Sequence, residues 1–346
     1  MSSKENYPEG NSHVLDARGL SVIYNSVRGE VYALEDVDFS IDSGEFVAVV
    51  GESGSGKSTL AHAIIGLLAP AASVSGEILY KDVDLAKIKK KDWINYRGRE
   101  IGMIFQEPMS SLDPIEKVDK QLAETLLVSK KKSDDGSEVS TESKLEIDSK
   151  KAGMNKQVYD WLRKVRIADP ESVAQRYPFQ LSGGMIQRVM IAMALSLSPS
   201  LLIADEPTTA LDVTTQAQIL KLMKALVDQI HMAIILITHD LGVAAQVADR
   251  IVVLYAGEVV EEGSIKQIFT HALHPYTQGL LKSYPKSAEM TDRLQTLPGS
   301  VPDLRSKLKG CKFADRCPFV TAICRQEKPR YVEVEPNHHA KCVLFY

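Results

Sequence analysis

Residues 51–58, Gly-Glu-Ser-Gly-Ser-Gly-Lys-Ser, decide the fold of this chain. They fit the Walker A pattern G-x-x-x-x-G-K-S/T, and they stand between an apolar run at 46–50 and a helix-like stretch at 58–68, the context that the motif requires. In such a loop, backbone N–H groups bind phosphate at the N-terminus of the following helix. The sequence therefore predicts a nucleotide site in which Lys57 bridges the β- and γ-phosphates and Ser58 ligates Mg²⁺. The other residues predicted to bind nucleotide here are Gly51, Ser53, Gly54, Ser55, Gly56 and Thr59.

Short apolar runs alternate with helix-like stretches along much of the remaining chain. Apolar runs at 201–204, 233–237 and 251–254 are separated by helix-like stretches at 216–229 and 241–247. This alternation predicts an α/β fold with a largely parallel, buried sheet. Residues 14–50 instead alternate apolar and polar side chains with glycines at turn positions, which predicts strands of a small antiparallel sheet.

Two segments carry further candidate chemistry. The apolar run 201–204 ends in Asp205 and Glu206; the first can hold Mg²⁺ as a Walker B aspartate does, and the second is placed to polarise an attacking water. Adjacent acids after a strand are equally typical of a plain turn or helix cap. Residues 181–185, Leu-Ser-Gly-Gly-Met, allow a phosphate to approach the backbone at a helix start, although a helix simply capped by Ser182 explains them as well.

The order of these motifs resembles that of the ATP-binding subunits of ABC transporters. Walker A, Leu-Ser-Gly-Gly, the Asp205–Glu206 pair and then His239 follow one another in the family's order. The resemblance implies that Gln106 senses Mg²⁺ and the γ-phosphate, and that His239 contacts the γ-phosphate and orients Glu206. Residues 210–212, Ala-Leu-Asp, resemble the D-loop of the family. Tyr24 resembles the aromatic residue that stacks on adenine, with Tyr32 as its competitor and core packing as the alternative for both.

The same resemblance assigns the signature segment to a neighbouring subunit. In the family, this segment binds the γ-phosphate of ATP held by the opposite subunit, so Ser182, Gly183 and Gly184 are expected to complete a partner's site. Met185 stands where the commoner form of this segment, Leu-Ser-Gly-Gly-Gln, has glutamine. This difference keeps the backbone groups that would bind phosphate and removes one side-chain amide. With Lys57, Glu206 and His239 present, we expect this half-site to hydrolyse ATP.

The segments around residues 181–195 and 201–220 resemble the oligopeptide/dipeptide permease branch, and more narrowly its D-type ATPase subunit. The resemblance implies a distinct F-type ATPase partner, two membrane permease subunits and a solute-binding protein. It also implies a permease contact near residues 106–114 and a peripheral location on the cytoplasmic face of the cell membrane. Oligosaccharides or nickel are the alternative cargoes of this branch. The alternative class is a soluble ABC ATPase of DNA repair or translation.

Composition limits the partners of the chain. It has 346 residues, a net charge of −4, 44% hydrophobic and 25% charged residues, which is typical of a globular protein and not of a basic nucleic-acid binder. Residues 1–13 are polar and lack the apolar core of a secretory signal. The longest apolar stretch, 61–74, contains His62 and Pro70 and is shorter than the roughly 18 residues of a spanning helix. We therefore expect membrane contact through partners only, and no nucleic acid.

All four cysteines stand near the C-terminus. They are Cys311, Cys317, Cys324 and Cys342, and without a secretion signal such a cluster indicates metal more often than disulfides. Four thiolates can enclose one zinc ion or one 4Fe–4S cluster, and the spacing does not decide between them. His338 or His339 could replace one cysteine, which would favour zinc. The match of residues 274–277, His-Pro-Tyr-Thr, to the peptide-permease branch favours a 4Fe–4S cluster, because tails of this type resemble cluster-binding modules.

These observations predict three regions. Residues 1–13 form a polar tail, and residues 14–263 form the nucleotide-binding domain: a P-loop NTPase core with an antiparallel β subdomain and a helical signature subdomain. Within it, 129–151 has six basic and six acidic residues and is expected to be a disordered insertion. Residues 264–346, rich in proline, are expected to form a separate, loop-rich extension that binds a metal.

Overall fold

The computed structural model describes residues 13–27, 29–107, 111–130, 144–208, 211–283 and 297–346. The chain divides into two compact units, of which the first comprises Met1–Trp93 with His231–Tyr346 and the second Ile94–Ile230. The strands of the first unit are β1 His13–Ser26, β2 Gly29–Asp42, β3 Phe46–Val50, β4 Ala72–Tyr80, β5 Val83–Asp84, β8 Ala233–Thr238, β9 Arg250–Tyr255, β10 Glu258–Ser264, β11 Tyr331–Glu335 and β12 His338–Lys341. Its helices are α1 Lys57–Ile64, α7 Leu241–Val247, α8 Ile265–His271, α9 Pro275–Lys282 and α10 Ala322–Gln326.

Two sheets organise the first unit. One is antiparallel in the order β2-β1-β4-β5, with Leu15, Ala17 and Leu20 of β1 buried, which confirms the antiparallel strands predicted for the first part of the segment 14–50. The end of that segment, residues 46–50, forms β3 and belongs to the other sheet. In the other, β3 pairs in parallel with β8 on one side and with β9 on the other. Every residue of β3 and β8 is buried, as the apolar runs predict for a parallel sheet covered on both faces.

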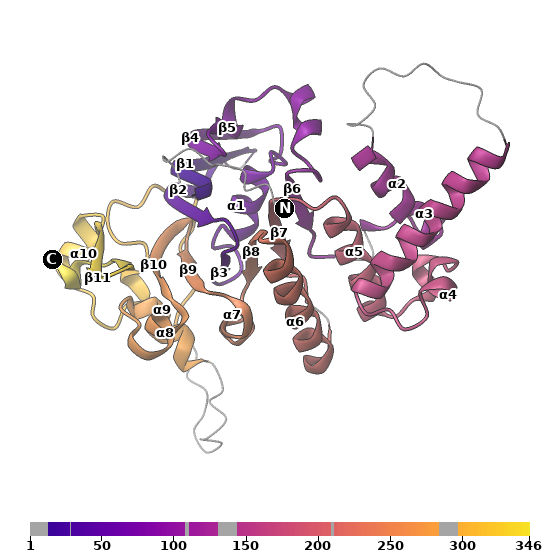
Figure 1. The fold of residues 1–346 in the computed structure, drawn as a ribbon. Coiled ribbons are helices and arrows are strands. Elements are labelled where there is room, and N and C mark those ends of the chain that lie inside the picture. The colour runs from indigo at the N-terminus through magenta and orange to yellow at the C-terminus, as the bar shows by residue number, and fades with distance from the viewer. Residues whose placement is uncertain (1–12, 28, 108–110, 131–143, 209–210, 284–296) are drawn as a thin grey trace. The chain divides into compact units, whose positions relative to one another are not determined.

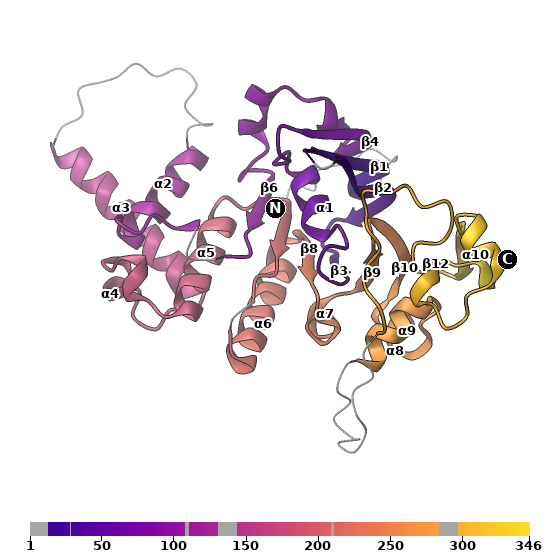
Figure 2. The same ribbon diagram turned by 180° about the vertical axis from the view of Figure 1, so that it is seen from behind.

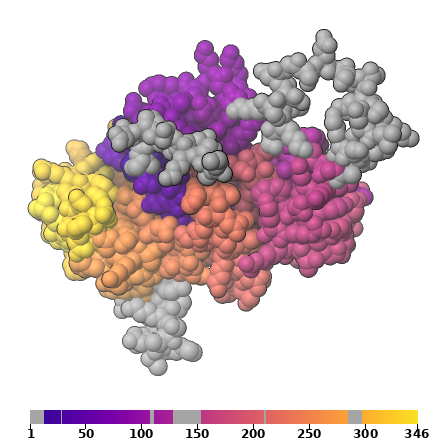
Figure 3. All heavy atoms as spheres, viewed as in Figure 1, coloured from indigo at the N-terminus to yellow at the C-terminus, as the bar shows by residue number. Residues whose placement is uncertain are grey.

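The C-terminal region continues this second sheet. Strand β10 pairs antiparallel with β9, β12 with β10, and β11 with β12. Figures 1 and 2 show α8 and α9 beside β10, and the β11–β12 hairpin next to α10. In Figure 3 the yellow C-terminal residues lie directly against the orange residues that precede them in the first unit. The structure thus differs from the separate extension that we predicted for residues 264–346.

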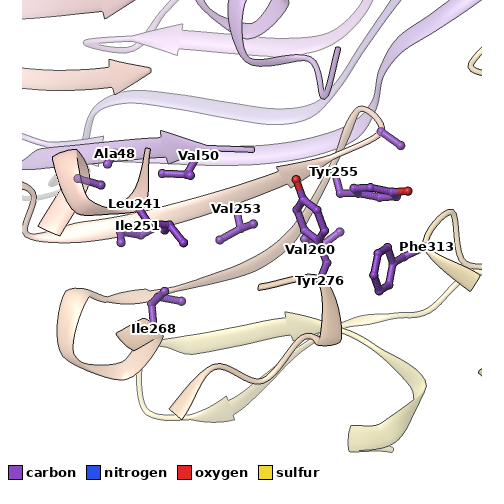
Figure 4. Close-up of a cluster of buried hydrophobic side chains, with 12 residues drawn as sticks. Ala48, Val50, Leu241, Ile251, Val253, Tyr255, Val260, Ile268, Tyr276 and Phe313 are labelled. Carbon is purple, nitrogen blue, oxygen red and sulfur yellow. The ribbon is translucent and has the colours of Figure 1, made fainter. Parts of the chain in front are cut away.

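One apolar cluster explains this continuity. Ala48 and Val50 of β3, Val253 and Tyr255 of β9, and Phe313 of the C-terminal region all belong to it (Figure 4). The rings of Tyr255 and Phe313 meet edge to face, with centroids 5.2 Å apart. Because Tyr276 and Phe313 of the C-terminal region are buried in this cluster, that region shares the core of the central strands.

The described part of the second unit contains a parallel strand pair and five α-helices. Its elements are β6 Ile101–Ile104, β7 Leu201–Asp205, α2 Val118–Lys130, α3 Lys144–Lys164, α4 Pro170–Ala174, α5 Gly183–Ser196 and α6 Val213–Ile230. Contacts among α2, α3, α4 and α5 make a helical group, as expected for the signature subdomain. Of the predicted insertion at 129–151, residues 144–151 are helical in α3, which differs from the irregular chain expected there, and residues 131–143 lie outside the described part.

Candidate functional site

The Walker A loop joins β3 to α1 in the first unit. Lys57 is buried, and its Nζ donates to the carbonyl oxygens of Gly51 at 2.7 Å and Glu52 at 2.9 Å. The hydroxyl-bearing residues Ser53 and Ser58 are exposed, whereas Ser55 is buried, and Thr59 follows in the first turn of α1. A cation held over a loop of inward-curving backbone at a helix N-terminus is an arrangement that binds phosphate.

Two glycines of this loop have no room for a side chain. A Cβ on Gly51 would lie 2.2 Å from the carbonyl oxygen of Leu254, and a Cβ on Gly56 would lie 2.8 Å from that of Ala33. Gly56 also has φ +106° and Gly54 has φ +78°, a region that favours glycine. Close backbone neighbours in β9 and β2 thus require glycine at positions 51 and 56, whereas Gly54 is favoured by its backbone angle alone.

His239 lies at the same edge of the sheet as the Walker A loop. Val50, the last residue of β3, stands opposite Thr238, the last residue of β8. Because the two strands are parallel, the residues that follow them leave the sheet at the same end. His239 is exposed there, and Asp240 caps α7 by accepting from the N–H of Gly242 at 2.7 Å. The first unit therefore presents an imidazole beside the phosphate-binding loop.

The second unit brings Gln106 and Glu206 together. Ile104 at the end of β6 stands opposite Ala204 of β7, and the side-chain amide of Gln106 donates to the carboxylate of Glu206 at 3.1 Å. Asp205 is buried at the end of β7. Glu206 has φ +45°, a conformation that costs a non-glycine residue free energy and is concentrated at functional sites.

The signature segment begins helix α5. Ser182 is its N-cap and accepts from the N–H of Met185 at 3.4 Å, so the capping explanation is confirmed. Ser182 and Gly183 are nevertheless exposed, and a Cβ on Gly184 would lie 3.0 Å from Thr215 of α6. In the segment that resembles the D-loop, Asp212 caps α6 by accepting from the N–H of Thr215 at 2.9 Å. Ala210 of the same segment lies outside the described residues. Residues 108–110, part of the expected permease contact, also lie outside them.

The two candidate adenine-stacking residues lie on adjacent strands. Tyr24 stands opposite Val31 and Ile23 opposite Tyr32 in the β1–β2 pair, and both tyrosines are partly buried. Tyr32 already has partners: its hydroxyl donates to Glu30 at 2.8 Å, and the Lys307 ammonium lies 5.3 Å from its ring centroid. This engagement leaves Tyr24 as the stronger candidate.

The four cysteines line one small cavity. Cys311, Cys317, Cys324 and Cys342 surround it together with apolar side chains that include Phe313, Phe319 and Leu344, and its volume is about 10 Å³. Burial raises the pKa of Cys311 to about 12 and also raises the pKa of Cys317 and of Cys342, because this apolar lining disfavours the charged thiolate form. Within the described ranges, no three His, Cys, Asp or Glu side chains are placed to hold a metal ion.

Sequence reasoning did not assign a site role to Tyr276, Arg316 or Glu52. The Tyr276 hydroxyl accepts from the backbone N–H of Glu52 at 2.9 Å, and Arg316 pairs with the Glu52 carboxylate at 2.7 Å. Glu52 is a variable position of the Walker A pattern, and its partners are more than 200 residues away. The sequence signal for this contact was Glu52 itself, because an acidic residue inside a phosphate-binding loop requires a nearby cation that compensates its charge.

Comparison with known families decides the affiliation of the chain. Residues 34–209 match the model of the ABC transporter family, and residues 260–324 match the oligopeptide/dipeptide transporter C-terminal region. The chain belongs to the ABC transporter family. This ABC protein is 45% identical over 332 residues to the dipeptide transport ATP-binding protein DppD of Lactococcus lactis subsp. cremoris, covering 96% of this chain and 90% of that protein.

Other relatives agree with this affiliation. The oligopeptide transport ATP-binding protein OppD of Bacillus subtilis is 44% identical over 338 residues, covering 97% of this chain and 90% of that protein. Among solved structures, the ATP-binding cassette MJ0796 bound to ADP and phosphate superposes with a TM-score of 0.59 at 31% identity, covering 72% of this chain and 98% of that one. CbiO1 of Clostridium perfringens gives a TM-score of 0.60 at 27% identity, covering 75% and 92% of the two chains. The cassette core predicted from sequence is confirmed.

In the described ranges, no helix is both long and apolar enough to span a bilayer.

Proposed function

We propose that this ABC protein hydrolyses ATP to drive the import of peptides across a membrane. The hydrogen bond between Gln106 and Glu206 carries the proposal, because it places a glutamate that can polarise water beside an amide that can sense Mg²⁺. The names of the relatives, dipeptide and oligopeptide transport ATP-binding proteins, supply the cargo class. Oligosaccharides or nickel remain the alternative cargoes.

The proposed chemistry gives each site residue a role. The Walker A backbone and Lys57 would hold the β- and γ-phosphates, Ser58 would ligate Mg²⁺, Tyr24 would stack on adenine, and His239 would contact the γ-phosphate. Asp205 and Gln106 would hold Mg²⁺, and Glu206 would accept the proton of the attacking water. Lys57 and Mg²⁺ stabilise the charge that develops on the transferred phosphoryl group, which is the larger part of such catalysis.

The partners follow from the exposed signature segment. Ser182 and Gly183 are free of covering side chains, which suits contact with ATP bound to a second ATPase subunit, an F-type chain. Two permease subunits and a solute-binding protein complete the proposed importer. Attachment to the cytoplasmic face of the membrane is peripheral and made through the permeases.

Reconstitution tests this function. The full complex in lipid vesicles, with the solute-binding protein outside, should take up labelled peptides only when ATP is enclosed in the lumen, and the Lys57→Ala complex should take up none. Uptake of an oligosaccharide or Ni²⁺ in place of peptide would assign the alternative cargo and contradict the peptide proposal. Recovery of the chain with bound nucleic acid and without permease would support the competing class of soluble ABC ATPases.

We further propose that the four cysteines hold a 4Fe–4S cluster. Support comes from their convergence on one cavity. A single zinc ion held by the four thiolates is the alternative occupant of the same site. Bound there, the cluster would cross-link the loops that carry its ligands.

Metal analysis of anaerobically purified protein tests the cluster. We expect about four irons and four sulfides per chain, with both lost in Cys317→Ser. Stoichiometric zinc without sulfide would contradict the cluster, as would iron and sulfide contents unchanged by the substitution.

A further inference from the structure

Glu52, the second residue of the Walker A loop, is held at both its side chain and its backbone by the C-terminal region. Its carboxylate accepts from Arg316 twice, at 2.7 Å between Nη1 and Oε2 and at 3.0 Å between Nη2 and Oε1. Its backbone N–H donates to the hydroxyl of Tyr276 at 2.9 Å. A two-point Arg–carboxylate pair fixes orientation as well as distance, so the beginning of the loop has a defined position.

Arg316 is itself rigidly supported. Its side chain is 5% exposed, its Nε donates to the carbonyl oxygen of Pro298 at 2.8 Å, and its guanidinium lies 5.7 Å from the ring centroid of Tyr255. Tyr276 packs on Tyr255 and on Phe313, with centroids 4.6 Å and 5.5 Å away, as Figure 4 shows. Both residues that hold Glu52 are thus anchored in the central apolar cluster.

The charge of Glu52 gives this contact a consequence for nucleotide binding. A carboxylate within a phosphate-binding loop repels the polyphosphate of ATP, and the repulsion is large where solvent is limited. The paired guanidinium of Arg316 compensates that charge, while the Nζ of Lys57 contacts the backbone carbonyl oxygens of Gly51 and Glu52. Arg316 precedes Cys317, so the cysteine-lined cavity is next to this pair along the chain.

We propose that Arg316, with Tyr276, is a positioning residue for the phosphate-binding loop, and that it sets the affinity for ATP by orienting and neutralising Glu52. The inference rests on the proposed ATP site. It assigns to the C-terminal region a part in nucleotide binding, exerted through Glu52, in addition to its part in the fold. Because Arg316 acts through Glu52 and not on the reacting phosphate, its loss should raise the KM for ATP and leave kcat largely unchanged.

The test measures binding of a fluorescent ATP analogue with Mg²⁺ to the full-length chain, and ATP turnover by the assembled complex. We expect Arg316→Gln to raise the Kd on the order of tenfold, because it leaves the Glu52 carboxylate uncompensated. Arg316→Lys should raise the Kd by an intermediate factor, since lysine restores the positive charge but cannot make the two parallel hydrogen bonds of the guanidinium. Glu52→Gln added to Arg316→Gln should return the Kd to within about threefold of the wild type, a rescue that a purely structural role of Arg316 would not give.

Two further variants keep the test decisive. Tyr276→Phe removes only one hydroxyl and should raise the Kd by about two- to fivefold even if Arg316→Gln folds poorly. Arg325→Gln is the matched control: Arg325 follows Cys324 and pairs with exposed Asp315 at 2.5 Å, so its Kd should equal that of the wild type. Folded Arg316→Lys and Tyr276→Phe proteins that both bind like the wild type would overturn the inference. Undiminished binding by Lys57→Ala would instead overturn the ATP site itself.

Discussion

The amide of Gln106 donates a hydrogen bond to the carboxylate of Glu206, with 3.1 Å between Nε2 and Oε2. The two residues are 100 positions apart in the chain, and the parallel pairing of β6 with β7 brings them to the same sheet edge. The left-handed backbone of Glu206, with φ +45°, belongs to this arrangement. A strained acid that accepts from an amide is suited to directing a water molecule.

Glu206→Gln should therefore abolish hydrolysis without abolishing ATP binding. The amide cannot accept a proton, so phosphate release by the complex should fall by about 10²- to 10⁴-fold. Equilibrium binding of ATP should stay near the wild-type value, because Lys57 and the loop backbone are unchanged. Turnover at the wild-type rate would exclude Glu206 as the base.

Ser182→Ala separates the capping role of Ser182 from its proposed role at a partner's ATP. Loss of an N-cap should lower the free energy of unfolding by about 0.5–2 kcal/mol. Ser264→Ala is the matched control, because Ser264 caps α8 by accepting from the N–H of Gln267 at 3.3 Å. Thermal unfolding should respond to both substitutions, whereas ATP turnover by the complex should fall only for Ser182→Ala. Equal turnover in the two variants would show that Ser182 acts only as a helix cap.

Gly56→Ala should disturb the loop through steric contact as well as through backbone strain. Gly56 and Gly29 have nearly equal φ angles, +106° and +110°, but only Gly56 has atoms within 4 Å of an added Cβ. Both substitutions incur the conformational cost of about 1–3 kcal/mol. Chemical denaturation should show a larger loss for Gly56→Ala, together with weaker ATP binding. Equal losses in the two variants would show that the contact with Ala33 relaxes freely.

His274 should make the stability of the protein depend on pH. Burial lowers the pKa of His274 from 6.5 to about 4, although Glu261 acts in the opposite direction. Its Nδ1 accepts from the N–H of Tyr276 at 3.1 Å, so the folded protein holds it neutral. Below pH 6.5 the unfolded chain takes up the proton first; the free energy of unfolding should therefore fall from about pH 6.5 to about pH 4 and then change no further through this group.

Denaturation curves across that pH range test the prediction. His274→Asn keeps an acceptor for the helix cap and should remove this part of the pH dependence. His271→Asn, which replaces an exposed histidine of α8, should retain it. The same slope in both variants would show that another group is responsible.

Most of the cassette could be predicted from local sequence. The runs at 46–50, 201–204, 233–237 and 251–254 became β3, β7, β8 and β9, because a short stretch of only apolar residues is stable as a strand covered on both faces. The Walker A residues and Ser182 could likewise be recognised locally, since loop glycines and helix caps act over a few positions.

Local sequence patterns are sufficient to identify the motifs of the ATPase, their order and the strands that carry them. The contacts between distant side chains depend on the tertiary structure. It placed Phe313 in the central apolar cluster, so that residues 264–346 extend the main sheet, and it joined Arg316 to Glu52 across 264 positions. Local sequence patterns do not predict such pairs, because burial and ion pairing depend on which surfaces the complete fold brings into contact.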